Sequence, residues 1–209
     1  MKSVKIGNKH VSPLMILAGI VVLAAVAAGA WYFYNNSQQK PAEFHEHANF
    51  AVFLNDVQFN FNQSKYMTNE STEVGKRQFV HMHDMNGGII HLHAPGITLG
   101  RFFDSLGMQL NSTCLTLDNG SSYCTSENSS LKMYVNGAQA NEFDALQLHD
   151  LDKVLISYGP HSDPMIQNQI SSVPSDACIY SGKCAAPPGF VNTESLTCKT
   201  GQASICSAK

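Results

Sequence analysis

The residues of this chain that could do chemistry are histidines spaced as His-x-His pairs. Side chains at positions i and i+2 of a β-strand share a face about 7 Å apart, so such a pair can offer two imidazoles to one ion. One pair arises easily by chance, but three pairs in one short stretch do not. Six of the nine histidines form these pairs, which are His45/His47, His81/His83 and His91/His93. The pattern predicts a transition-metal site; the simpler alternative is a set of scattered surface or core histidines.

The ligand type narrows the choice of metal. Imidazole suits zinc, copper, nickel and iron, whereas calcium and magnesium need a carboxylate-rich cage. Copper and zinc lead, and copper is slightly favoured because it tops the affinity order for nitrogen ligands. The thioethers of Met82 and Met85 would favour Cu(I), but strand alternation turns Met82 away from its neighbouring histidines, as in a core residue. Six imidazoles exceed the need of one four-coordinate ion, so either two ions bind or some histidines are outer-shell partners or loose secondary ligands.

Other polar residues near the pairs are weaker candidates. Glu43, Glu46 and Asp84 are the nearest carboxylates, and Glu46 should point away from its neighbouring histidines. Asp84 either orients an imidazole or caps a turn. His149 and His161 flank the last predicted strand and are either further ligands or solvated loop histidines.

The second and third pairs lie on two short β-type runs, 79–83 and 89–93, which predict a hairpin. His83 can sit opposite His91, and His81 opposite His93, only if the loop has an odd number of residues. We expect the three-residue loop 86–88, with Gly88 in the left-handed conformation beside a bulge. A two-residue loop would place the pairs on opposite faces. The strand that carries the first pair should lie beside this hairpin.

The remaining pattern predicts an α+β domain with a mixed or antiparallel sheet packed against one helix. Thr98 is a plausible N-cap for a short amphipathic helix that ends before Gly107. The turn signal at residues 118–120 predicts a hairpin that brings Cys114 and Cys124 together as a disulfide. The other expected elements are strands at 45–54, 57–61, 131–135 and 154–158 and a helix at 164–172.

The N-terminal region contains an uncharged apolar run, Leu14 to Tyr34. Twenty-one residues at about 1.5 Å each span roughly 30 Å, the thickness of the hydrocarbon core of a bilayer. Lysines before the run and aromatic residues at its end predict a transmembrane helix at 13–34 with a cytoplasmic tail at 1–12, which includes His10. The alternative is a cleaved signal peptide, because residues 28–30 (Ala-Gly-Ala) resemble a cleavage site. Both interpretations export the rest of the chain.

The exported part divides into a polar stalk at 35–43, a metal-binding domain at 44–159 and a cysteine-rich tail at 160–209. All six cysteines follow the apolar run, and this even number favours disulfides in an oxidising compartment. A thiolate metal site is disfavoured because no Cys-x2-Cys pair occurs and no cysteine is near the histidine pairs. The four cysteines of the tail allow three pairings, and the sequence does not choose among them.

The charge of the exported part argues against one class of partner. After the apolar run, ten Lys and Arg stand against sixteen Asp and Glu, a formal charge of −6. Nucleic acid is excluded as an expected partner because phosphate binding needs a clustered basic surface. The expected partners are a membrane and a metal cation.

Two resemblances extend this interpretation. The segment LQLHDLDKVLISYG, residues 146–159, resembles the final turn and strand of β-grasp domains, which implies that its strand is central in the sheet. The apolar run, HEHANF, VHMHD, IHLHAPG, LISYG and the cysteine-rich end together resemble a family of uncharacterised membrane-anchored extracytoplasmic proteins of archaea and small-genome bacteria. Neither resemblance implies an activity.

Three functions fit these patterns. The first is a membrane-tethered protein that captures, stores or passes copper or zinc outside the cell. The second is a zinc enzyme in which three histidines leave one position for activated water. The third is an interaction module or subunit of a membrane complex with a structural ion. The sequence has no HExxH helix, Gly-x-Ser-x-Gly elbow, phosphate loop or dinucleotide fingerprint. Only the histidines could support catalysis, and binding is favoured over it.

Overall fold

The computed structural model describes residues 4–6, 9–11, 13–37, 44–68 and 75–190. It divides into two compact units, Met1–Ala42 and Glu43–Lys209. Glu43, one of the candidate carboxylates, and the cysteines at 198 and 206 lie outside the described residues.

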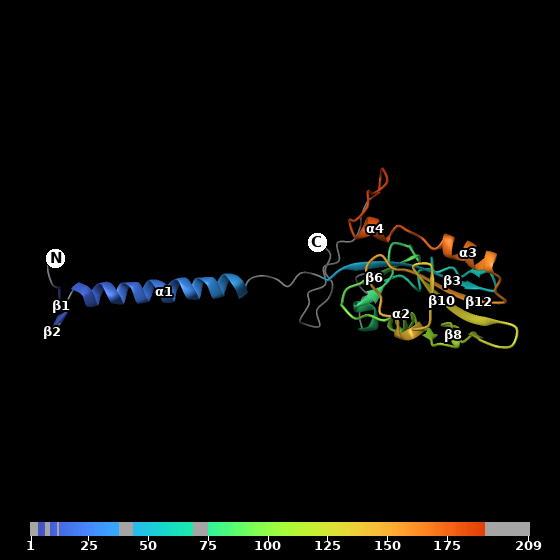
Figure 1. Ribbon diagram of the computed structural model, residues 1–209, viewed down its shortest axis with the longest axis horizontal. Coiled ribbons are helices and arrows are strands. Elements are labelled where there is room, and N and C mark those ends of the chain that lie inside the picture. The colour runs from blue at the N-terminus through green and yellow to red at the C-terminus, as the bar shows by residue number, and fades with distance from the viewer. Residues whose placement is uncertain (1–3, 7–8, 12, 38–43, 69–74, 191–209) are drawn as a thin grey trace. The chain divides into compact units, whose positions relative to one another are not determined.

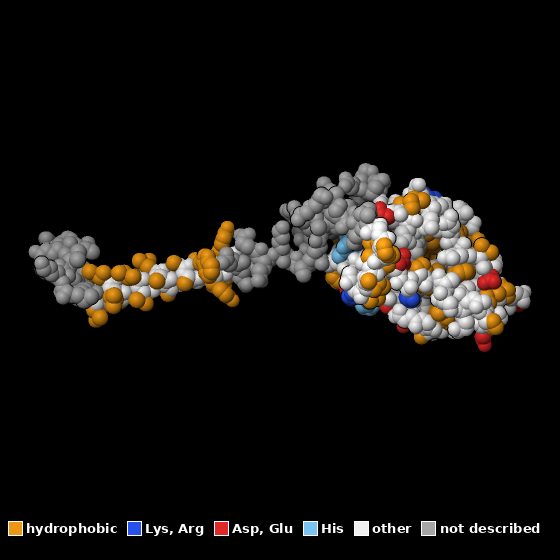
Figure 2. Space-filling model, turned by 90° about the horizontal axis from the view of Figure 1, so that it is seen from above, with side chains coloured by type: hydrophobic (Ala, Val, Ile, Leu, Met, Phe, Trp, Pro, Cys, Tyr) orange, Lys and Arg blue, Asp and Glu red, His pale blue; other side chains and the backbone are white. Residues whose placement is uncertain are grey.

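The first unit consists of a short hairpin and one long helix. Strands β1 (Val4–Ile6) and β2 (Lys9–Val11) pair antiparallel, and α1 runs over Pro13–Ser37. Within α1 the segment Leu14–Tyr34 has a mean hydropathy of 2.4, and none of it is buried. Apolar side chains run along the face of the helix that Figure 2 shows. The predicted helix is therefore confirmed, and it is long and apolar enough either to cross a membrane or to serve as a signal sequence.

The second unit is built on a mixed sheet. Its strands follow the order β11-β10-β12-β3-β6-β5, and β4 pairs with β3 beside this path. Strands β12 and β3 are parallel, and the other pairs are antiparallel. The strands are β3 (Glu46–Leu54), β4 (Val57–Gln58), β5 (Val80–His81), β6 (Ile89–Leu92), β10 (Ser130–Val135), β11 (Ala138–Ala140) and β12 (Lys153–Gly159). The predicted α+β class is confirmed, and β12 is central, as the resemblance to β-grasp domains implied.

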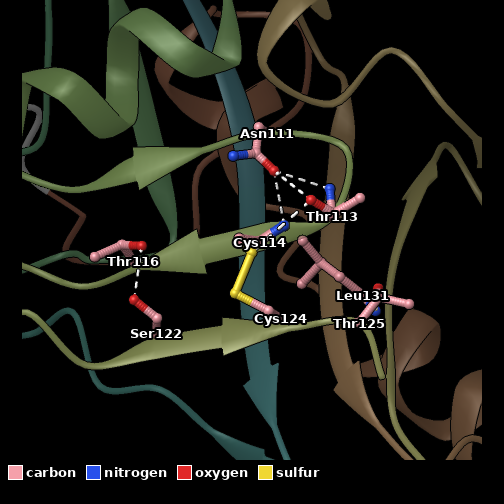
Figure 3. The surroundings of a disulfide bond; sticks show 8 residues. All are labelled: Asn111, Thr113, Cys114, Thr116, Ser122, Cys124, Thr125 and Leu131. Atoms are coloured by element: carbon pink, nitrogen blue, oxygen red, sulfur yellow. Dashed lines mark hydrogen bonds between the residues drawn. A yellow bond between two sulfur atoms is a disulfide. The ribbon is translucent and has the colours of Figure 1, made fainter. Parts of the chain in front are cut away.

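A small second sheet carries the first disulfide. It consists of β7 (Gln109–Leu110), β8 (Cys114–Thr116) and β9 (Ser122–Cys124). Gly120, with a φ of +84°, supplies the left-handed conformation that the turn between β8 and β9 requires. Cys114 and Cys124 are directly opposite and disulfide-bonded, as Figure 3 shows. The predicted hairpin and its disulfide are confirmed.

The helices of this unit are short. They are η1 (Gly75–Gln78), α2 (Leu99–Ser105), η2 (Phe143–Ala145), α3 (Asp163–Ser172) and α4 (Ala177–Tyr180). Thr98 caps α2 by accepting a hydrogen bond from the Arg101 N–H, and Gly107 follows the helix with a φ of +75°. The predictions of α2 and of the helix at 164–172 are confirmed.

Helices cover the sheet on both faces, whereas one packed helix was expected. On one face, alternate residues of β3 (Ala48, Phe50 and Val52) join the main core with Phe102 of α2. On the other face, Ala51 and Phe53 pack with residues of β12 and α3. Figure 1 shows α2 on one side of the sheet and α3 and α4 on the other. Because both faces of β3 are buried, its side chains are apolar from Phe50 onward, and the polar residues Glu46, His47 and Asn49 lie near its start.

Candidate metal centre

Three adjacent strands bring the histidine pairs onto one face of the sheet. His47 of β3 is directly opposite His91 of β6, and His91 is in turn directly opposite His81 of β5. Directly paired residues point to the same face, and so do residues two positions away along each strand. The three pairs therefore share the face that α3 and α4 cover.

The six imidazole rings form one continuous group. Their centroids are 4.5 Å apart for His45–His47 and for His45–His93, 4.9 Å for His47–His91, 4.8 Å for His81–His93 and 3.9 Å for His83–His91. His45 is half-buried, and each of the other five is at most 6% exposed. The expected cluster is present, in contrast to the alternative of scattered histidines.

One triad within the cluster has a spacing suited to an ion. His45, His47 and His91 each offer one ring nitrogen, and these three atoms lie within 4.8 Å of one another. Zinc–nitrogen bonds of about 2.0–2.1 Å place two ligands of one ion no more than about 4 Å apart. A small inward movement of the rings would therefore bring the triad to bonding distance.

Hydrogen bonds set the tautomers of two further rings. The Nδ1 atom of His81 lies 2.7 Å from the Arg77 carbonyl oxygen, and that of His83 lies 2.9 Å from Oδ2 of Asp84. A carbonyl or carboxylate oxygen can only accept, so in each ring Nδ1 carries the hydrogen. In the neutral imidazole, Nε2 then carries the lone pair that a metal needs. Of the two roles considered for Asp84, orientation of an imidazole is the one that this contact supports.

A hydroxyl and a carboxylate orient His47 in the same way. The Ser181 hydroxyl donates to Oδ1 of Asp150 at 2.5 Å, so it accepts from Nδ1 of His47, which is 2.7 Å away. Asp150 also accepts from the His47 backbone N–H at 3.0 Å and from Nζ of Lys183 at 2.5 Å. Burial opposes ionisation of Asp150, but the hydrogen bonds from Lys183, Ser181 and His47 outweigh it and lower the pKa of Asp150 below its ordinary value. Asp150 is therefore an anionic anchor beside the cluster.

The expected hairpin loop is wrong in its details. His81 is opposite His91 rather than His93, and the tight turn spans residues 83–86, where the Asn86 N–H donates to the His83 carbonyl at 3.0 Å. Asp84 and Met85 each have a φ of +56°, as the central residues of a type I′ turn do. The partner of His81 is two residues away from the expected one. Because a shift of two residues keeps the side-chain alternation, the histidine pairs still share one face.

The glycines of this loop serve close packing instead of the expected left-handed turn. Gly88 is not among the residues with positive φ. A Cβ on Gly87 would lie 2.5 Å from Cβ of Phe61, and one on Gly88 would lie 2.8 Å from Cγ of Pro174. Both positions therefore need glycine because other parts of the chain approach the backbone there.

The other residues considered as metal ligands do not belong to the histidine cluster. Met82 is fully buried in the core, as predicted, whereas Met85 is 49% exposed. His149 is exposed beside Asp152, and the two ring nitrogens of His161 contact the hydroxyls of Ser130 and Ser157. Neither of these histidines belongs to the group of possible metal ligands found among the described residues.

Two of the orienting residues, Asp150 and Ser181, escaped prediction from the sequence. They are more than 100 residues from His47 along the chain, and no spacing rule connects a serine in a cysteine-rich tail to a histidine in a strand. The disulfide between Cys178 and Cys184 closes a loop, but the sequence neither selects this pairing nor indicates where the loop packs. Comparisons with protein-family models, with curated proteins and with solved structures found no match.

Proposed function

We propose that this chain binds a transition-metal ion, copper or zinc, at the outer surface of a membrane and captures, stores or passes it on. The observation that carries this proposal is the convergence of six imidazoles from three neighbouring strands into one cluster on one face. The proposed ligands are His45, His47, His81, His83, His91 and His93.

The hydrogen bonds around the cluster support metal binding. His47, His81 and His83 each direct Nδ1 to an oxygen acceptor, an arrangement that holds ligand imidazoles in place in metal proteins. In each of these rings the neutral form then carries its lone pair on Nε2, the form in which imidazole ligates a metal.

The excess of ligands supports storage or transfer. An ion that is held by three or four imidazoles has further imidazoles within 5 Å of its ligands, at the ring separations reported above. It can exchange ligands one at a time, and each step replaces one metal–nitrogen bond by another. Half-buried His45 is the most accessible member and therefore the proposed entry point.

The rest of the chain supports an extracytoplasmic place for this site. The apolar helix supplies a tether or an export signal, and the disulfides Cys114–Cys124 and Cys178–Cys184 are stable in an oxidising compartment. The negative formal charge after the helix favours the approach of cations.

One observation favours a second candidate function. Burial of five of the six rings would also suit a structural ion that braces the sheet of an interaction module or of a subunit of a membrane complex. In that case the fold would depend on the ion, because unmetallated buried imidazoles stabilise the sheet poorly.

The test uses the full chain purified in detergent, stripped of metal with a chelator and then titrated with Cu(II) or Zn(II). We expect at least one tightly bound ion per chain, loss of this ion in the double variant His83→Ala/His91→Ala, and retention in the matched control His149→Ala. Circular dichroism of the stripped protein should show an intact fold. Absence of stoichiometric metal in the wild type contradicts the proposal, and unfolding on metal removal selects the structural candidate instead.

A further inference from the structure

A short segment of the tail closes over one side of the histidine cluster. This cap segment, Asp176–Cys184, contains α4 and the disulfide Cys178–Cys184. Asn49 of β3 holds its beginning: the Asn49 amide donates to Oδ1 of Asp176 at 2.7 Å and accepts from the Ala177 N–H at 3.0 Å. Because Asn49 stands two residues after His47 on the same strand face, the cap segment is fixed beside the first histidine pair.

The middle of the cap segment contacts the cluster itself. The Tyr180 ring lies 5.8 Å from the His47 ring and 5.7 Å from the His91 ring, measured between centroids. Ser181 follows and bridges Nδ1 of His47 to Asp150. The cap segment thus reaches two of the three histidines in the triad that is spaced for an ion.

The end of the cap segment is held by charge. Lys183 pairs with Asp150, the carboxylate that also receives the Ser181 hydroxyl and the His47 N–H. Asp150 therefore connects the cap segment to the backbone and, through Ser181, to the ring of His47. A change in the position of residues 181–183 is transmitted to that ring.

The disulfide encloses the residues that make these contacts. Tyr180, Ser181 and Lys183 all lie between Cys178 and Cys184, and the Lys183 and Cys184 N–H groups both donate to the Cys178 carbonyl. The closed loop restricts these residues before they contact His47 and Asp150. They therefore lose less conformational entropy when they make those contacts. Cys184 is exposed and Cys178 half-buried, so a reductant can reach the bond.

Resting on the proposed metal-binding function, we propose that Ser181 and Asp150 are positioning residues for His47 and that the Cys178–Cys184 disulfide thereby controls how tightly the metal is held. In the reduction step, a dithiol supplies two electrons and two protons. The Sγ–Sγ bond breaks, two cysteine thiols form, and the dithiol becomes a disulfide. The opened cap segment then holds Ser181 less firmly against His47, and the metal exchanges faster.

The positioning role is tested with Ser181→Ala and Ser181→Thr in the full chain in detergent. We expect alanine to weaken Co(II) and Zn(II) binding about 10- to 100-fold, the usual effect of removing a partner of a ligand histidine, and threonine to restore it because the hydroxyl is kept. The visible d–d spectrum of bound Co(II) should change in the alanine variant, which a merely structural role would not cause. Unchanged affinity and an unchanged spectrum in Ser181→Ala overturn the proposal.

The redox role is tested with Cys178→Ser/Cys184→Ser, and Cys114→Ser/Cys124→Ser on the separate small sheet is the matched control. The first double variant should bind Zn(II) about tenfold more weakly or worse and lose it faster to a chelator, and the control should match the wild type. Adding Ser181→Ala to the first variant should weaken binding no more than about twofold further, because both changes act through His47. Equal effects of the two cysteine variants, or fully additive effects with Ser181→Ala, overturn the proposal.

A reduction experiment without mutations completes the test. The wild type is reduced with dithiothreitol, alkylated with iodoacetamide, freed of reagents and then titrated with Zn(II). It should bind as weakly as the Cys178→Ser/Cys184→Ser variant, and wild-type affinity after reduction overturns the redox role. If the oxidised wild type binds no metal, the proposed function fails and this inference with it; if it binds and none of the variants differs, only this inference fails.

Discussion

The two halves of one sheet face differ in what covers them. In one half, Ala51 and Phe53 of β3 and Leu155 of β12 pack beneath α3, a helix of ten residues, through apolar contacts with Ile166 and others. In the other half, His47, His91 and Asn49 contact the four-residue helix α4, which hydrogen bonds, a lysine–aspartate pair and a disulfide hold in place. Polar side chains gain little from burial alone, so the cover of the histidine half needs directed and covalent bonds.

This difference assigns separate tasks to the two halves. The apolar half contributes free energy of folding through buried area, and small changes there alter stability. The histidine half contributes the proposed ligands, and changes there should alter metal binding while the fold persists. Four predictions test this separation, from the largest expected effect to the smallest.

Acid should affect the histidine half most strongly. Imidazole ligates only when neutral, and its ordinary pKa is about 6.5, so protons compete with the metal as the pH falls below that value. With two or more histidine ligands, lowering the pH from about 7.5 to 5.5 should weaken binding about 100-fold or more. Competition titrations with a chelator at several pH values measure this. Metal retention that is unchanged at the lower pH contradicts ligation by histidine.

Leu155→Ala should affect the apolar half. This side chain is 1% exposed beneath α3, and removing a buried leucine side chain leaves a cavity that costs about 2–5 kcal/mol of unfolding free energy. Denaturant unfolding of the stripped protein measures the loss. The Zn(II) affinity of the folded variant should remain within about threefold of the wild type, and a much larger change would show that the halves are not separate.

Asp84→Asn should weaken metal binding about tenfold, because an amide is a poorer acceptor than a carboxylate for the His83 Nδ1–H. Asparagine tolerates the left-handed conformation that residue 84 adopts, so the turn should persist. Calorimetric titration compares this variant with the control Asp104→Asn, whose carboxylate lies on α2 beside Lys76. Equal affinities of the two variants would remove Asp84 from the site.

His161→Gln should change the acid response of the apolar half slightly. Burial, and to a lesser extent the nearby Lys132, lower the pKa of His161 below its ordinary value. The folded state therefore binds this proton less readily than the unfolded state does, and the contribution to stability is present above about pH 6.5 and is lost as the pH falls through the lowered pKa. Thermal melts of the stripped protein between about pH 7.5 and 5 should show a smaller loss for the variant than for the wild type. An identical pH dependence would show that His161 does not contribute.

The sequence alone determined the local features of this protein. The apolar helix, the α+β class, the helix that Thr98 caps, the Cys114–Cys124 hairpin and the common face of the histidine pairs follow from periodicity, turn chemistry and strand alternation, which act over a few residues. The same local rules predicted the wrong loop at residues 86–88. The glycines there are required because Phe61 and Pro174 approach the backbone, and not because the turn needs a positive φ. Those contacts have no signature within the loop.

Only the tertiary structure decided the register and the surroundings of the site. The His81–His91 pairing depends on a turn at 83–86 that two non-glycine residues with positive φ make possible. The Ser181–Asp150 support of His47 joins three segments that are far apart in the chain. Strand alternation specifies which side of a strand a histidine faces, but the packing of distant segments specifies which groups it meets there, because that packing depends on the free energy of the whole fold.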